Sequence, residues 1–286
     1  MVNEGVYEDL DEVKSHERKK MNKKTRAEIL QIANAAKEKI LLSPSKRRLQ
    51  KLQLALRWVH SWGCTTSALF CQAVGSQHPG FITHLVKDGL LRHEKIFNAN
   101  FLLATNKGVN FLKNFIPEDD LIFNLPLQRK AISWGVEHNL VCQKILASEL
   151  AKSDDVISWN SDRELRSLLT DGGKVPDASI TTDLFVTYFE IELTKKHQRE
   201  LEEMLVSLAK LLAKQKITYK QGWIFTKKIW VEHYERALDK LEIDGKYHEW
   251  ELNKNTNRYI CTEVADFTNQ EIAALESIQV RSLPDQ

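Results

Sequence analysis

One extended run, residues 185–194, constrains the fold more than any other part of the sequence. It reads Phe-Val-Thr-Tyr-Phe-Glu-Ile-Glu-Leu-Thr and is rich in the β-branched and aromatic residues that favour strands. Because side chains alternate across a strand, Phe189 and Ile191 face one side, whereas Glu190 and Glu192 face the other. Two neighbouring carboxylates on a half-buried strand repel each other, so they need a compensating cation or tolerated strain. The run therefore predicts a strand that carries paired acids.

A third acid, Asp177, precedes this run on another extended stretch. The connection Thr181-Thr182-Asp183 is short enough for a hairpin, which would place Asp177 opposite or diagonal to Glu190. Three carboxylates meeting at one point form a hard-oxygen site, which suits Mg²⁺ or Mn²⁺ better than zinc. Such an ion can neutralise phosphodiester charge and activate a water molecule. Lys195 and Lys196 directly follow the strand and are expected near the phosphate. Pro-Asp pairs and Glu-x-Glu strands also arise by chance, and spacing alone favours a purely structural role.

The residues after 120 alternate between helical and extended patterns, which predicts an α/β layer with a mixed sheet. The expected helices cover 127–150, 201–212 and 228–241, and the expected strands cover 174–180, 184–194 and 222–225.

Residues 47–115 show the pattern of a smaller, compact fold. Three helical segments come first, and the pair Thr65-Thr66 is expected to cap the second of them. Two short extended runs and a final helix opened by Thr105 and Gly108 follow. This order of helices, two-stranded wing and helix is typical of a winged helix-turn-helix. The expected helices cover 49–59, 67–71 and 81–87, and the extended runs cover 91–97 and 100–104.

The third helix of this segment would enter the major groove of DNA, with Thr83, His84 and Lys87 as its exposed residues. The basic cluster Lys46-Arg47-Arg48 is a candidate for binding phosphate, as is the run of basic residues over 14–26. A solvated helix face explains such clusters equally well. The same fold also serves as a dimerisation or protein-docking module, so both alternatives stay open beside DNA binding.

Bulk composition limits the functional classes. A net charge of +2 over 286 residues excludes a molecule that coats nucleic acid with uniform positive charge. The four cysteines are scattered, without the close pairs of a zinc site or a secreted disulfide framework. No apolar run approaches the length of a membrane span, and no secretory signal follows the charged N-terminus. We expect a cytoplasmic protein with no membrane span and no small-molecule cofactor.

Pro176-Asp177, followed thirteen positions later by Glu190-Ile191-Glu192, resembles the PD-(D/E)xK motif of restriction-endonuclease-like nucleases. Glu192 stands where that motif has lysine. Two upstream segments, 138–140 and 159–166, add further matches. Together with the expected winged helix, they resemble the replication-relaxation family, which includes the MOBC class of plasmid relaxases (MobC- and TraX-like mobilisation proteins). The resemblance covers residues 47–230.

The residue patterns and the resemblance together predict an α+β protein with three parts: a basic N-terminal helical arm (1–45), a winged-helix DNA-binding domain (46–120) and a restriction-endonuclease-like nuclease domain (121–286). It implies a DNA relaxase that nicks one strand at a plasmid origin of transfer with Mg²⁺ or Mn²⁺. A conjugative coupling protein and accessory mobilisation proteins would be its partners.

Carried onto this chain, the family's metal-binding and catalytic acids are Asp177, Glu190 and Glu192. Glu164 is a possible additional metal ligand, and Lys195 is a candidate replacement for the missing lysine. His138 falls at a position that the family shares.

Simpler roles compete for three upstream residues. A histidine on an apolar helix, such as His138, is more often a satisfied core residue. Glu164 and Arg166 can pair with each other on a surface helix, and Trp159 is expected to be a packing anchor. The tyrosines lack the three-histidine cluster of covalent relaxases, so we do not expect a tyrosine nucleophile.

Two other functions stay open. The chain can be a restriction or repair endonuclease, or a catalytically inactive winged-helix replication or transcription factor. Retention of Asp177, Glu190 and Glu192 favours an enzyme, whereas the missing lysine favours the inactive factor.

Overall fold

A computed structural model describes most of the chain after residue 43, and the chain divides into two units between Leu52 and Gln53. The predicted N-terminal arm, with its basic run over 14–26, lies outside the described residues apart from Pro44 and Ser45. The described residues are 44–76, 80–96, 98–117, 120–129, 135–152, 155–169, 174–215 and 219–284.

Helix α2 (Pro44–Trp62) begins in the first unit and continues into the second. It stops at Gly63, whose φ of +76° lies in the left-handed region that glycine adopts without steric cost. Helix α3 (Ser67–Val74) begins where the Thr66 hydroxyl accepts a hydrogen bond from the backbone N–H of Leu69. The cap at Thr66 agrees with the sequence prediction, whereas α2 is longer at both ends than the expected 49–59.

A small antiparallel sheet follows, in the order β1-β3-β2. Thr105 caps the last helix by accepting from the backbone N–H of Gly108, as expected. Gly108 also has a packing role, because a Cβ there would lie 2.2 Å from the Leu90 carbonyl oxygen. The predicted order of three helices, two strands and a helix is confirmed, and β1 is an addition. The elements are β1 (Thr65–Thr66), α4 (Gly80–Lys87), β2 (Leu91–Ile96), β3 (Ala99–Ala104) and α5 (Asn106–Leu112).

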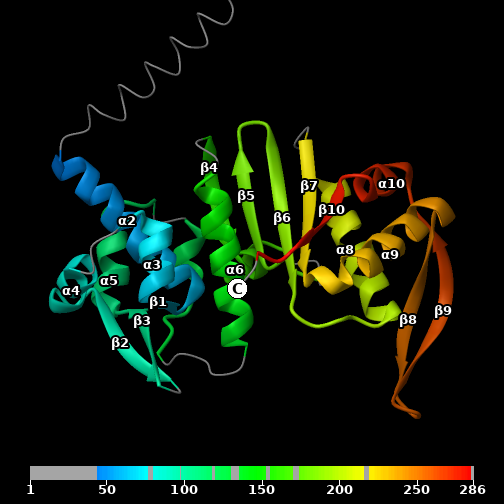
Figure 1. The fold of residues 1–286 in the computed structure, drawn as a ribbon, viewed down its shortest axis with the longest axis horizontal. Helices are drawn as coiled ribbons and strands as arrows, with labels where there is room; N and C mark the ends of the chain where they lie inside the picture. The colour runs from blue at the N-terminus through cyan, green and yellow to red at the C-terminus, as the bar shows by residue number, and fades with distance from the viewer. Residues whose placement is uncertain are drawn as a thin grey trace, which may run out of the picture. The chain divides into compact units, whose positions relative to one another are not determined.

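The predicted mixed sheet is present and has five strands in the order β10-β7-β6-β5-β4 (Figure 1). The pairs β4–β5 and β5–β6 are antiparallel, whereas β6–β7 and β7–β10 are parallel. The described chain is therefore an α+β fold with a mixed sheet. Its strands are β4 (Val156–Ser161), β5 (Ala178–Thr182), β6 (Phe185–Glu192), β7 (Tyr219–Thr226) and β10 (Ile278–Ser282).

Helices cover both faces of this sheet. Phe189 and Ile191 share a hydrophobic cluster with residues of α6 (Val136–Leu150), whereas Val186 and Tyr188 share one with Leu165 of α7 (Asp162–Leu168) and with three further helices. The alternation predicted for the run is correct, but both faces of β6 are buried because it is the central strand. The three helices are α8 (Gln198–Lys214), α9 (Val231–Asp244) and α10 (Asn269–Leu275).

Strands β4 and β10 and helix α10 were not predicted, and three further parts of the chain differ from the prediction. The helix expected from residue 127 begins at Val136, because Gly135 with its φ of +73° precedes it and residues 125–129, with Pro126, are not helical. The helix expected from 228 opens with a 3₁₀ turn. The C-terminal hairpin was not predicted. The 3₁₀ turn is η2 (Lys228–Trp230), and the hairpin consists of β8 (Lys246–Asn253) and β9 (Arg258–Asp266). The remaining element is η1 (Leu121–Asn124).

The segments on the two sides of residue 120 share one core. Trp58 and Trp62 of α2 lie in the same hydrophobic cluster as Trp159 and Phe189 of the sheet. The Trp58 and Trp159 ring centroids are 5.1 Å apart, so Trp159 is the packing anchor that was expected. The division into domains at residue 120 remains a prediction. Within the described part of the chain, no helix combines the length and the apolar character that crossing a bilayer requires.

Candidate functional site

The predicted acids meet where β6 ends and the chain enters β5. Ala178 pairs with Phe189, and continuing this register by one residue places Asp177 across from Glu190. The Asp177 backbone N–H donates to the Phe189 carbonyl at 2.9 Å. The Asp177 Oδ2 atom accepts from the backbone N–H of Ile191 at 2.8 Å. The hairpin inferred from the short connection is therefore confirmed.

Asp177, Glu190 and Glu192 line one pocket of about 370 Å³, and Lys174, Lys196 and His138 line it as well. Three acids thus share a pocket with three groups that can carry positive charge. Lys174, Lys196 and His138 can therefore act as the compensating cations that neighbouring carboxylates on a buried strand require.

Glu190 is the most deeply buried of these acids. Its side chain is 3% exposed, and burial raises its pKa to about 8. The charges of Asp177 and Glu192 add to this increase, whereas the Lys174 ammonium opposes it. A carboxylate in this environment needs positive charge beside it to stay ionised at neutral pH.

Lys174 supplies part of that charge and was not predicted. Its Nζ atom lies 2.5 Å from Glu190 Oε2 and 3.4 Å from Glu192 Oε1. Burial by itself lowers the pKa of Lys174, but the charges of Glu190 and Glu192 outweigh burial and raise that pKa. Strict strand alternation would put Lys174 and Asp177 on opposite sides. Residues 174–177 are not a regular strand, which is why the pattern did not reveal this lysine.

Lys196, and not Lys195, contacts the acids after the strand. Its Nζ atom lies 3.2 Å from Glu192 Oε2, and its carbonyl oxygen accepts from His233 at 3.2 Å. Lys195 is exposed and is not among the described residues that line the pocket. Lys195, the candidate replacement for the missing lysine, is therefore not brought to the acids, whereas Lys174 and Lys196 both contact them.

His138, on helix α6, also contacts the residues of this site. Its Nε2 atom lies 2.8 Å from the Ile191 carbonyl oxygen and 3.4 Å from Asp177 Oδ2. Its hydrogen bond with Asp177 is the main cause that raises its pKa to about 9, against the opposing effect of burial. With 38% of its side chain exposed, His138 is not the enclosed core histidine of the simpler interpretation.

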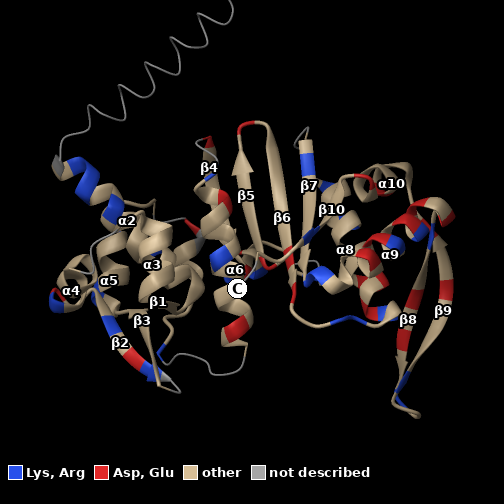
Figure 2. Cartoon of the chain, in the orientation of Figure 1, with Lys and Arg blue, Asp and Glu red and all other residues tan. Residues whose placement is uncertain are grey.

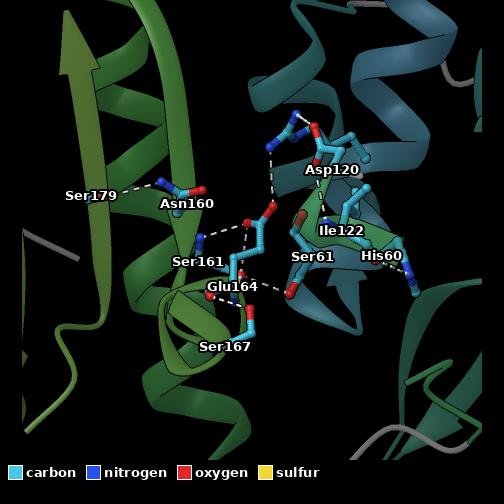
Figure 3. Close-up of polar contacts among 10 residues, drawn as sticks. His60, Ser61, Asp120, Ile122, Asn160, Ser161, Glu164, Ser167 and Ser179 are labelled. Atoms are coloured by element: carbon cyan, nitrogen blue, oxygen red, sulfur yellow. Dashed lines mark hydrogen bonds and ion pairs between the residues drawn. The ribbon is translucent and has the colours of Figure 1, made fainter. Parts of the chain in front are cut away.

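Glu164 is not among the described residues that line this pocket, and its own polar contacts are drawn in Figure 3. Its Oε2 atom accepts from the Ser161 backbone N–H at 2.9 Å in a capping box that opens α7. Its Oε1 atom lies 3.2 Å from an Arg57 guanidinium nitrogen, and Arg57 also reaches Asp120 at 3.4 Å. Burial raises the pKa of Glu164. The structure does not bring it together with the other predicted metal ligands.

The alternative in which Glu164 pairs with Arg166 is not what the structure shows. Arg166 pairs with Asp162, one helical turn earlier, at 3.5 Å. The reason is that the capping box turns the Glu164 carboxylate inward, where Arg57 meets it.

The predicted DNA-binding residues lie on two helices. Lys46, Arg47 and Arg48 are exposed in the first turns of α2, where Figure 2 shows basic residues along the ribbon. On α4, Ile82 and Leu85 are buried. The exposed face of that helix carries Thr83, His84 and Lys87. These residues are therefore accessible, and their contact with DNA remains a prediction.

The donor set of the pocket fits a hard divalent cation. Carboxylate oxygens of Asp177 and Glu190 and the carbonyl of Ile191 line or border one pocket. Mg²⁺ and Mn²⁺ prefer such oxygen ligands. A second set of possible ligands, His138, Cys142 and Asp177, has its atoms within 4.8 Å of one another. Burial raises the pKa of the Cys142 thiol well above its usual value, which disfavours the thiolate that a metal would need.

No protein-family model matches the chain, and no curated protein or solved structure matches it either.

Proposed function

We propose that the chain is a metal-dependent DNA endonuclease that nicks one strand. The observation that carries this proposal is Lys174, whose ammonium lies between Glu190 and Glu192 beside Asp177. The sequence motif lacked its lysine, and a lysine from the preceding loop lies at the acids instead. Acids and lysine in one pocket form a set of groups suited to phosphodiester cleavage.

Asp177 and Glu190 would hold the divalent ion, with Glu192 as a further ligand. A bound Mg²⁺ or Mn²⁺ supplies Lewis-acid chemistry that activates water and neutralises charge on the phosphate. Lys174 stays protonated, because its acidic neighbours raise its pKa. It therefore donates hydrogen bonds and positive charge to the phosphate oxygens or the attacking water, and does not remove a proton.

His138 would protonate the leaving oxygen. Its partly exposed ring lines the pocket, and its Nε2 atom lies 3.4 Å from Asp177 Oδ2. A positioned acid of this kind accelerates reactions by about 10²- to 10⁴-fold.

We assign the nicking activity to a relaxase that starts plasmid mobilisation at an origin of transfer. The resemblance of Pro176-Asp177 and Glu190-Ile191-Glu192 to the nuclease motif supports this assignment. The helix order of residues 44–112 supports a winged helix-turn-helix, with the exposed face of α4 toward the major groove. A conjugative coupling protein and accessory mobilisation proteins are its proposed partners, and the cytoplasm is its proposed location.

Supercoiled plasmids with and without a cognate origin test this function. We expect Mg²⁺- or Mn²⁺-dependent conversion to open circles for the plasmid with the origin. Asp177→Asn and Glu190→Gln should each lower the rate by at least about a hundredfold, since both acids act on the same ion. Glu249→Gln, at an exposed strand position, is the matched control and should cut normally.

Other outcomes identify the competing functions. Linearisation, or nicking without preference for the origin, would indicate a restriction or repair endonuclease. Binding without any cleavage would indicate the inactive DNA-binding factor. Normal nicking by both Asp177→Asn and Glu190→Gln would show that the proposed active site is wrong.

A further inference from the structure

A second groove adjoins the acid pocket, because His138 and Asp177 line both. Its volume of about 460 Å³ lies in the range of about 300–1,000 Å³ that small-molecule sites occupy. Half-buried Val136 contributes apolar surface to its wall, whereas Trp62, Cys64 and Cys142, which also line it, are nearly inaccessible. The groove is therefore large enough and apolar enough to take a planar ring beside the acids.

Two glycines without side chains form part of the groove's wall. Gly63 and Gly135, with φ of +76° and +73°, both line it. A Cβ at Gly135 would meet no atom within 4 Å, so that part of the wall borders open space.

Two arginines of α7 add positive charge to the groove. Arg163 links α7 to two other segments, since it donates to the His60 carbonyl at 2.6 Å and to the Pro126 carbonyl at 2.7 Å. Arg166 is different: its side chain is 66% exposed, and its 3.5 Å pair with Asp162 is of the surface kind that contributes little. The Arg166 guanidinium can therefore turn toward an anion in the groove.

The groove and the pocket together fit a nucleic-acid strand. Nucleotides of one strand follow each other at a rise of about 3.4 Å along the duplex. A phosphate bound through a metal ion at Asp177 and Glu190 would therefore have its neighbouring nucleotide within reach of the adjoining groove. Lys174 and Lys196 line the pocket, and Arg166 lines the groove. Both cavities thus carry positive charge beside the acids.

We propose that the groove binds the nucleotide next to the scissile phosphate. The base is turned out of the double helix onto the groove wall at Val136, and its outer phosphate pairs with Arg166. Enzymes that act on extruded nucleotides bind them in pockets of this kind. The proposal rests on the proposed nuclease function, because the scissile phosphate defines which nucleotide enters.

Binding of a fluorescein-labelled single strand of twelve nucleotides, measured by anisotropy in EDTA, tests the groove without cleavage. Arg166→Ala should weaken binding about tenfold and reduce the slope of log K against log salt by about one. Arg236→Ala is the matched control. Like Arg166, Arg236 is an exposed helical arginine that pairs with an acid one turn away, in this case Glu232. It lines a different pocket and should bind the strand like the wild type.

Competition tests the base contact. Deoxyadenosine monophosphate should displace the labelled strand at a concentration at least about fivefold lower than deoxyribose 5-phosphate does, and Arg166→Ala should weaken both competitors. Equal displacement by the two competitors would overturn the base site, and equal binding by Arg166→Ala and the wild type would overturn the phosphate contact.

These readouts separate the groove from the nuclease function. A wild-type protein that nicks plasmids while Arg166→Ala binds the strand normally overturns the groove alone. A protein that never cleaves, yet shows the Arg166 effect in EDTA, supports strand binding in the groove and counts against the nuclease.

Discussion

At the scale of single residues, the charges around Glu190 distinguish this site from the rest of the described sheet. This carboxylate is nearly inaccessible, yet Asp177 and Glu192 lie close enough to raise its pKa further. Lys174 offsets part of that cost through its 2.5 Å contact. A buried acid cluster of this kind is costly for stability, and such perturbed groups concentrate at functional sites.

Replacing Lys174 tests its role in cleavage. Lys174→Ala should lower the nicking rate by about 10²- to 10³-fold, because a charge donor to the reacting phosphate is lost. Lys174→Arg should retain more activity, since it keeps the charge. Lys195→Ala is the control, because Lys195 is exposed just beyond the same strand. Equal rates for Lys174→Ala and Lys195→Ala would remove Lys174 from the mechanism.

At the scale of elements, predictions succeeded where the signal was local. The caps at Thr66 and Thr105 and the apolar stripe of α8 each lie within a few residues of the element they define. The start of α6 was missed because the helical pattern continued upstream and outweighed Gly135. Strand β10 was missed because it forms by pairing with the distant β7.

The hairpin β8–β9 escaped prediction for another reason. Most of β9 is exposed, so its side chains do not alternate between apolar and polar. In the candidate site, too, a local signal was predictable and a contact made only by the folded chain was not. The pairing of Asp177 with Glu190 followed from a short hairpin, whereas Lys174 lies on an irregular segment that only the folded chain places at the acids.

The link between helices α2 and α7 allows a stability prediction. Arg57→Ala leaves the fully buried Glu164 carboxylate without its partner, and breaking such a pair costs about 3 kcal/mol or more. Arg236→Ala breaks an exposed pair with Glu232 and should cost less than about 1 kcal/mol. Urea unfolding of both variants measures the difference. Equal free energies of unfolding would show that Arg57 does not stabilise Glu164.

At the scale of the whole second unit, one hydrophobic cluster joins α2 to the sheet. Trp58 and Trp62 pack with Trp159 and Phe189, and α2 ends at the groove beside His138. The segment proposed to bind DNA and the segment proposed to cut it therefore share a core. This shared core would hold a bound strand in a fixed position relative to the acids.

The most direct test of this account is Mn²⁺ binding, followed by the electron paramagnetic resonance signal of the free ion. The wild-type protein should bind Mn²⁺, and Mg²⁺ should compete for the same site. Glu190→Gln should weaken Mn²⁺ binding at least about tenfold, because it removes a charged ligand, while Glu249→Gln leaves it unchanged. Equal Mn²⁺ binding by the wild type and Glu190→Gln would contradict a metal site at Asp177, Glu190 and Glu192.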